Sequence, residues 1–501
     1  MCDIADQSGP ASHMSERIAF SLAPAGSGGV PPATCRELKS ALTCDLSHLA
    51  RSTSPQQQQG LRVRHGKGPA RRGELMEPRL AFDRTVVAVD HGDDTVNVMV
   101  EVTAPEIEVA ERRPVDAVVV IDRSGSMAGA KLRSVTQAVI DILRRKPTSD
   151  RIGVISFDSS AEIVSDLTTE PATAIGRVGH IRSGGSTNLS AGWLLAQQML
   201  ATSGRSETLK RIIVLTDGHV NAGVDDRDAL AQMMSGGLAA SVSTSLIGFG
   251  DGYDELMLRA LADAGQGNEY FCEGPDQAAA VFNDEFGGLA KVVGQNLAFT
   301  VEAAPAVAAV EVLNDFPTTA DGARTCVSVG DIYSGETRSL VFRLSIRPQR
   351  TPGPLDLGLL RISWASVLGT PELRTLEVPI TVTAGHPGEH DLGADPRVRD
   401  EVIVLQAAKD RLEVRRQAEA GDVQGAVDGL RSIRARLSQV RGQEQQVEEI
   451  VRDIHDIERG GWTHRAAKKA MSDSRQMSRK RQASYLNDKE GWDEDAWDPF
   501  S

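Results

Sequence analysis

The stretch Val115-Asp116-Ala117-Val118-Val119-Val120-Ile121-Asp122-Arg123-Ser124-Gly125-Ser126-Met127 decides the fold of this 501-residue chain. A run of mainly β-branched apolar residues ends abruptly in polar residues and glycine. Such a run predicts a strand that is buried on both faces, as in a parallel sheet covered by helices. Ligands of such sheets bind at the carboxyl ends of the strands. Asp122, Ser124 and Ser126 therefore mark a candidate site, and their carboxylate and hydroxyls suit a hard divalent cation.

Two further segments extend this set of oxygen ligands. Gly184-Gly185-Ser186-Thr187-Asn188 precedes an apolar helical pattern. Ile212-Ile213-Val214-Leu215-Thr216-Asp217-Gly218 is a second buried-strand pattern, and it also ends in a carboxylate. The ordered set of Asp-x-Ser-x-Ser, then Thr, then Asp resembles the metal-ion-dependent adhesion site of von Willebrand factor A domains. The resemblance covers about residues 114–288.

The resemblance implies a fold, a metal and a role for each of five residues. The implied fold is a doubly wound, mostly parallel α/β sheet. Mg2+ is then held by Ser124, Ser126 and Thr187, while Asp122 and Asp217 act largely through water. Because hydroxyls are neutral, such a cation keeps much of its charge and seeks a carboxylate from a partner protein's Asp or Glu. The sequence leaves open whether Mg2+, Mn2+ or Ca2+ is the bound ion.

Composition excludes several functional classes. A net charge of −14 disfavours nucleic-acid binding by the whole protein. No apolar run approaches the roughly 18 residues that cross a bilayer. The apolar run Ile18–Ala23 is shorter than the about 7–15 residues of a signal peptide. The five cysteines are too widely spaced for a disulfide framework or a zinc site. We therefore expect a cytoplasmic protein with reduced thiols.

Periodicity divides the amino-terminal three quarters of the chain into four segments. Residues 1–75 are rich in Ser, Pro, Gly and Gln and are expected to be disordered. Residues 76–110 and 291–388 alternate apolar and polar residues, which predicts antiparallel strands. The strands of 76–110 are too few to be stable alone, so we expect them to join a β-sandwich formed by 291–388. The α/β domain of 111–290 would then be inserted into that sandwich.

The carboxyl-terminal quarter has a different character. Residues 395–460 carry apolar stripes at helical spacing and predict a small helical bundle or hairpin. Residues 461–501 are expected to be a disordered tail, basic over His464–Arg481 and acidic toward the end. Two tryptophans and a phenylalanine lie in the acidic part, Trp492–Phe500, which is a candidate second docking segment for a partner protein.

Other polar residues near the site are given ordinary roles. Arg123 is interpreted as solvated, and His219 and Asn221 as loop residues rather than partner contacts. The acidic residues that follow are interpreted as helix-capping charge rather than a second metal cluster; these are Asp225, Asp226 and Asp228.

The leading functional hypothesis is a non-enzymatic scaffold that binds a partner protein through the metal. An alternative is a regulatory subunit of a chelatase-like AAA+ machine, whose ATPase would be a separate protein because this chain has no Walker A motif. A metal-dependent hydrolase with Asp122 as phosphoryl acceptor would need a second Asp two residues later, where this chain has Ser124. A surface adhesin is disfavoured because no export signal is evident.

Overall fold

We describe a computed structural model of the chain. It describes residues 62–64 (backbone), 76–90, 94–107, 113–205, 207–217, 219–238, 241–250, 252–272, 277–289, 291–368, 372–386, 393–460, 474–475, 477–479 and 481–482 (backbone). All of these residues belong to one compact unit that spans Gln59–Ser501. Most of the predicted amino-terminal segment and the candidate docking segment Trp492–Phe500 lie outside the described residues.

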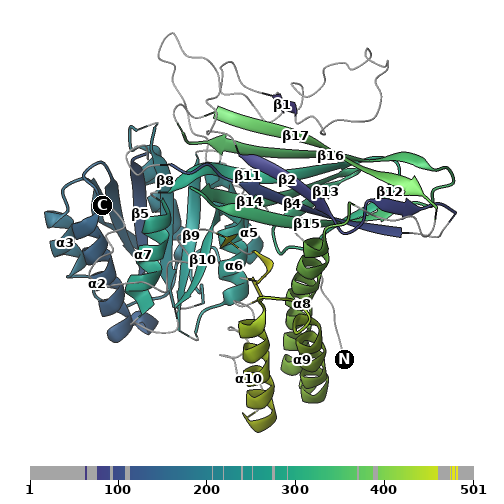
Figure 1. Cartoon of the computed structure of the whole chain (residues 1–501). Coiled ribbons are helices and arrows are strands. Elements are labelled where there is room, and N and C mark those ends of the chain that lie inside the picture. The colour runs from purple at the N-terminus through teal and green to yellow at the C-terminus, as the bar shows by residue number, and fades with distance from the viewer. Residues whose placement is uncertain are drawn as a thin grey trace, which may run out of the picture. The chain divides into compact units, whose positions relative to one another are not determined.

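A six-stranded sheet forms the centre of the α/β domain (Figure 1). Its order is β10-β9-β8-β5-β6-β7, and every neighbouring pair is parallel except β6 with β7. All eight residues of the central strand β5 are buried, which explains its unbroken apolar run. The strands are β5 (Val115–Asp122), β6 (Arg151–Phe157), β7 (Ala161–Thr168), β8 (Leu209–Thr216), β9 (Val242–Phe249) and β10 (Gln266–Cys272).

Helices cover both faces of this sheet and form two separate apolar cores. Buried side chains of α2, α3 and α7 contribute to the core on one face, and those of α4, α5 and α6 to the core on the other. The helices are α2 (Ala130–Arg145), α3 (Ala172–Val178), α4 (Leu189–Ala201), α5 (Arg227–Gly237), α6 (Glu255–Ala264) and α7 (Ala278–Leu289), with the short 3-10 turn η2 (Gly125–Met127) before α2.

Two further sheets form a sandwich with a shared apolar core. One sheet has the order β1-β17-β16-β11-β14-β13, with β3 paired to β17. The other has the order β12-β15-β4-β2, with β18 paired to β15. The strands are β1 (Arg62–Arg64), β2 (Glu77–Phe82), β3 (Val86–Ala88), β4 (Asp94–Thr103), β11 (Val292–Ala303), β12 (Val307–Val312), β13 (Thr318–Asp321), β14 (Arg324–Tyr333), β15 (Thr337–Ile346), β16 (Gly353–Ser366), β17 (Glu372–Gly385) and β18 (Arg481–Gln482).

Strand β4 joins the segment before the α/β domain to the segment after it. It pairs antiparallel with β15 over its whole length, from Asp94 opposite Ile346 to Thr103 opposite Thr337, and with β2 on its other side. The α/β domain therefore lies between strands of the sandwich in the sequence, and the predicted fold class is confirmed. β1 is a structured piece within the segment for which the sequence predicts disorder, because its backbone pairs with β17.

A buried ionic network joins the α/β domain to the sandwich. Arg211 of β8 is 1% exposed and lies between Asp331 of β14 and Glu285 of α7. Glu285 also accepts hydrogen bonds from Ser245 Oγ at 2.6 Å and Tyr270 Oη at 2.9 Å. Burial alone would lower the pKa of Arg211, but the two carboxylates outweigh it and raise that pKa. The network holds the guanidinium charged in the interior.

Helices α8 (Pro396–Glu419), α9 (Val423–Leu437) and α10 (Glu444–Gly460) pack around their own apolar core. α8 also packs on the sandwich, where Val398 and Leu405 contact Met99 and Val341. No helix in the described part of the chain is long and apolar enough to span a membrane.

Part of the predicted tail is packed against these helices. Ser474 and Met477 are 1% and 5% exposed, and Met477 belongs to the core of α8, α9 and α10. The backbone of β18 extends the sheet at β15. Among the described residues of this basic stretch, Met477 packs in an apolar core, and Arg475 and Arg479 pair with half-buried carboxylates.

Candidate metal centre

The two aspartates of the predicted site come together because their strands are neighbours. β5 and β8 are parallel and in register, with Ile121 opposite Leu215, so Asp122 and Asp217 emerge at the same edge of the sheet. Their side chains are buried, with exposed fractions of 0% and 2% for the two residues. Two carboxylates in a water-poor setting favour a cation at this edge.

Asp122 holds the loop that follows β5. Its Oδ1 accepts a hydrogen bond from the backbone N–H of Ser124 at 2.7 Å, and its Oδ2 accepts one from Thr216 Oγ1 at 2.6 Å. Burial raises the pKa of Asp122, the charge of Asp217 raises it further, and the hydrogen bonds from Ser124 and Thr216 oppose the shift. Asp122 thus positions Ser124 through its backbone and holds the side chain of Thr216.

The hydroxyls of the loop form a compact oxygen cluster with Asp217. Ser124 Oγ lies 3.1 Å from Ser126 Oγ, and Ser126 Oγ donates to Asp217 Oδ1 at 2.6 Å. In octahedral Mg2+ sites with bonds of about 2.0–2.1 Å, adjacent ligands lie about 2.9 Å apart. The spacing of the two serine oxygens fits neighbouring positions of such an ion, and the all-oxygen donor set fits its chemistry.

The loop that carries Thr187 is hydrogen-bonded to the serine loop. Gly184 N donates to Arg123 O at 2.8 Å, and Gly125 N donates to Gly185 O at 3.3 Å. Gly185 has a φ of +78°, and a Cβ there would lie 2.9 Å from the Asp158 side chain. Glycine is therefore required where the two loops meet.

Asn221 fixes Thr187 from the other side. Asn221 Oδ1 accepts the N–H of Thr187 at 2.8 Å, and Asn221 N donates to Thr187 O at 3.2 Å. Thr187 is 3% exposed, and Asn188 caps α4 by accepting the N–H of Ala191 at 3.1 Å. The loops that carry the five predicted residues thus meet at one rim of the sheet, and Asn221, which the sequence indicates only as a loop residue, holds Thr187 there.

Lys131 is a site residue that the sequence analysis missed. It lies in the first turn of α2, and its Nζ forms an ion pair with Asp217 Oδ2. Its side chain is 35% exposed, whereas that of Asp217 is fully buried. The sequence does indicate this contact in one respect: Lys131 follows the Ser126–Met127 turn closely, and its long flexible side chain can reach back to the strand end.

Arg123 differs from the expectation of a solvated residue. Its guanidinium pairs with Asp158 at 3.1 Å and with Glu162 at 2.6 Å. Both acids lie on the β6–β7 hairpin, and β6 is the neighbour of β5, so the sheet order brings them beside Arg123. Asp226 fulfils the expected capping role, because its side chain accepts the N–H of Ala229 at the start of α5 at 2.8 Å.

Comparison with known proteins assigns the fold. Residues 117–219 match the family profile described as von Willebrand factor type A domain. The solved structure of a von Willebrand factor type A protein from Catenulispora acidiphila superposes with a TM-score of 0.64 at 16% identity, covering 81% of this chain and 98% of that one. At this identity the likeness shows the fold alone.

Relatives by sequence cover more than the α/β domain. The uncharacterised protein sll0103 of Synechocystis is 28% identical over 332 residues, which are 64% of this chain and 78% of that protein. The uncharacterised protein YfbK of Escherichia coli is 25% identical over 323 residues, 58% of this chain and 54% of YfbK. The chain thus spans about half the length of YfbK. The sheet order, the profile match over residues 117–219 and the structural likeness together show that the α/β part of this chain has the von Willebrand factor type A fold.

Proposed function

We propose that this protein is a non-enzymatic interaction protein that binds a partner through a Mg2+ ion. Ser124, Ser126 and Thr187 would hold the ion directly, with Asp122 and Asp217 acting through water. The observation that carries the proposal is the serine pair at 3.1 Å, hydrogen-bonded to Asp217 at the rim shared by β5 and β8. When bound, the ion would supply a positive centre for a carboxylate of the partner.

The chain's own residues prepare this rim for an anionic ligand. Asp122 positions Ser124, and Asn221 positions Thr187, so the hydroxyls need little rearrangement. The direct ligands are neutral, which leaves the charge of the ion available to an outside group. Lys131 adds a further positive charge beside Asp217. A surface with this balance favours acidic side chains of a protein partner.

Replacement of Thr187 by Val tests the direct ligands. The side chain keeps its shape and loses its hydroxyl. Removal of a residue that only hydrogen-bonds a metal ligand typically lowers metal affinity by about 10–100-fold. We therefore expect the loss of a direct ligand to lower Mg2+ affinity by at least that much. Isothermal titration with MgCl2 measures the change. Thr136→Val is the matched control, because Thr136 Oγ1 bonds only within α2, to Leu132 O and Arg133 O. Equal affinities in wild type, Thr187→Val and Thr136→Val would contradict the proposal.

Replacement of Lys131 by Met is expected to strengthen metal binding. The ammonium competes with the ion for Asp217, and two unit charges about 4 Å apart near a protein surface interact by about 4 kcal/mol. Lys131 is partly exposed and can turn into water, so we expect a smaller gain, about threefold to tenfold in Mg2+ affinity. Lys210→Met, at the opposite end of β8, should leave the affinity unchanged. A weaker site in Lys131→Met would show that the lysine supports the metal instead.

Partner binding is tested with the same variants. Tagged wild type and Thr187→Val are incubated with native lysate in Mg2+ and in EDTA, and bound proteins are identified by mass spectrometry. We expect a partner that is retained only by wild type in Mg2+. A partner retained in all four samples would place the interaction on another surface of the chain.

A further inference from the structure

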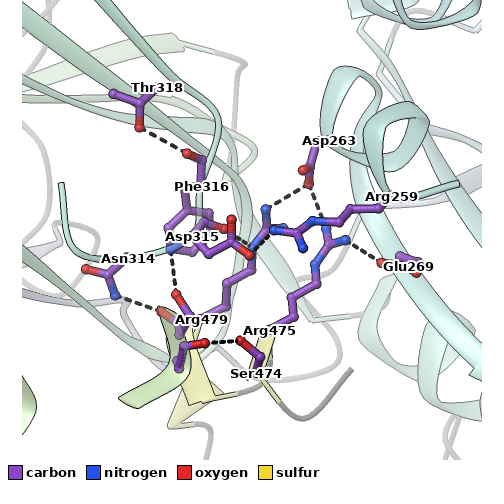
Figure 2. Close-up of polar contacts among 12 residues, drawn as sticks. Arg259, Asp263, Glu269, Asn314, Asp315, Phe316, Thr318, Ser474, Arg475 and Arg479 are labelled. Carbon is purple, nitrogen blue, oxygen red and sulfur yellow. Dashed lines mark hydrogen bonds and ion pairs between the residues drawn. The ribbon is translucent and has the colours of Figure 1, made fainter. Parts of the chain in front are cut away.

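A cluster of arginines and carboxylates lies where the α/β domain, the sandwich and the carboxyl-terminal residues meet (Figure 2). Arg475 forms ion pairs with Glu269 of β10 and with Asp263 of α6, the latter at 2.6 Å. Arg479 pairs with the same Asp263 at 2.8 Å and lies over the Phe316 ring at 4.7 Å. Both arginines therefore converge on side chains of the α/β domain from a segment distant in sequence.

The sandwich supplies the other wall of this site. Asn314 Nδ2 donates to the backbone oxygen of Ser478 at 2.8 Å, and Asp315 N donates to Ser478 Oγ. The backbone oxygen of Asp315 accepts a hydrogen bond from Arg479 Nε. The first two contacts bind the backbone oxygen and the hydroxyl of Ser478, which is 2% exposed.

The helical domain and a sheet edge complete the contacts. Ser474 Oγ donates to Ala408 O of α8 at 2.7 Å, and Met477 is buried in the helical core. Beyond them, Arg481 and Gln482 pair by backbone with Arg338 and Thr337 of β15. The described residues of 474–482 thus contact the α/β domain, the sandwich and the helices α8, α9 and α10.

The charge balance defines what this site can bind. We name the three carboxylates of Asp263, Glu269 and Asp315 the acidic site. They face three guanidinium groups. One of these, that of Arg259 in α6, pairs with Asp315. The other two guanidiniums belong to the carboxyl-terminal segment. Without that segment, Asp263 and Glu269 would be left beside Arg259 alone. A ligand of this site must therefore bring two positive charges.

The spacing of the two arginines suits one helical turn. Arg475 and Arg479 are four positions apart, which places them on one face of a helix. Met477 lies between them in sequence and is buried in the helical core. A peptide of the form Arg-x-Met-Ser-Arg therefore presents charge to the α/β domain and an apolar side chain to α8, α9 and α10.

The two arginines are half-buried, and their guanidinium groups lie close to each other and to Arg259. Burial and the neighbouring charge of Arg475 lower the pKa of Arg479 to about 9, against the opposing effect of Asp263. Burial likewise raises the pKa of Glu269, although Arg475 and Arg259 oppose this. Much of the attraction between these groups is thus offset by the loss of water, so the segment is bound less firmly than its ion pairs alone imply.

We propose that the acidic site is a peptide-binding site for a basic segment with arginines four residues apart, and that residues 474–482 are its ligand in this chain. The bound segment acts as a latch that joins α6 and β10 of the α/β domain to the sandwich and α8. Asp263 and the start of β10 lie at the sheet edge where the strands begin, while the metal centre lies at the edge where β5 and β8 end. The acidic site and the metal centre are therefore two separate sites that take ligands of opposite charge.

The test uses the full chain with Arg475→Glu and Arg479→Glu, which removes the ligand and leaves the acidic site intact. A fluorescein-labelled peptide with the sequence of residues 472–484 is titrated, and binding is measured by anisotropy. We expect saturable binding to this variant that is at least tenfold tighter than to wild type, because the tethered segment of wild type competes at a millimolar effective concentration. Arg434→Glu with Arg441→Glu is the control, since it makes the same charge change on exposed residues of the helical domain.

Specific outcomes would overturn the proposal. Equal peptide binding to wild type and to the charge-reversed chain, or no binding to either, would exclude an exchangeable ligand. A peptide that carries the same two arginine-to-glutamate changes must not bind, and its binding would also exclude the proposed recognition. A second measurement uses the milder variant Arg475→Gln, in which hydrogen exchange of residues 477–479 should be at least tenfold faster than in wild type. Unchanged exchange there would show that the segment is a fixed part of the fold.

Discussion

Replacement of Arg211 by Met is expected to lower the free energy of unfolding by about 3–5 kcal/mol, the usual result of removing one partner from a buried ion pair. Met fills a similar volume but removes the guanidinium that pairs with Asp331 and Glu285 in the interior. Because Asp331 belongs to the sandwich and Arg211 to the α/β domain, we also expect the two domains to melt separately. Calorimetry and urea unfolding measure both effects.

Two comparisons isolate the cause of this loss. Arg343→Met removes a half-buried guanidinium that pairs with the exposed Glu311 and donates weakly to Asn97 at 3.3 Å, and it should cost less than Arg211→Met, about 1 kcal/mol. Asp331→Asn combined with Arg211→Met should recover part of the stability, because it removes one of the two carboxylates that face the lost guanidinium. A loss for Arg211→Met no larger than for Arg343→Met would show that the network does not join the domains.

Replacement of Asp122 by Asn should separate metal binding from folding. Asn has nearly the same shape, and its amide can still bond the Ser124 N–H and the rotatable Thr216 hydroxyl. Loss of the charge should weaken Mg2+ binding by about 100-fold, the upper end of the range for groups that support a metal site. Without metal, stability should stay equal or rise, because burial raises the pKa of Asp122 and so disfavours its charged form.

The two effects have opposite signs, so thermal unfolding in EDTA and in excess Mg2+ can measure them together. Mg2+ should raise the melting temperature of wild type, since a ligand that binds only the folded state stabilises it, and should raise that of Asp122→Asn by much less at the same Mg2+ concentration. Asp150→Asn is the matched control: Asp150 is also buried, but it accepts the Val115 N–H at the opposite end of β5. An Asp122→Asn variant that gains as much stability from Mg2+ as wild type would exclude Asp122 from the site.

The sequence predicts the parts of this structure that depend on local pattern. The apolar run from Val115 to Ile121 requires a buried strand, and a polar end to such a strand marks the site edge. The alternation of valines over residues 96–102 likewise indicates a strand with one face in a core. These patterns suffice for the fold class and for the rim where the five candidate ligands lie.

Contacts set by tertiary structure are not visible in the pattern. Lys131 reaches Asp217, and Arg123 reaches the β6–β7 hairpin, only because the sheet order places those groups nearby. Arg211 lies in an apolar strand where a single arginine gives no indication of its partners in α7 and β14. The segment around Met477 reads as a solvated basic tail, because one apolar residue among many charges carries no periodicity.

The pairing of β4 with β15 has a consequence for synthesis on the ribosome. β4 ends at Thr103, and its partner Thr337 follows 234 positions later. At about 5–20 residues per second, β4 emerges roughly 10 to 50 seconds before the strand that covers it. The α/β domain, whose strands and helices are contiguous from Val115 to Leu289, can form most of its two cores in that interval, although Tyr333 and Val367 join one of them later. Until β15 arrives, the valine-rich β4 is an exposed edge that can pair with other nascent chains, and this makes it the segment where a chaperone is needed most.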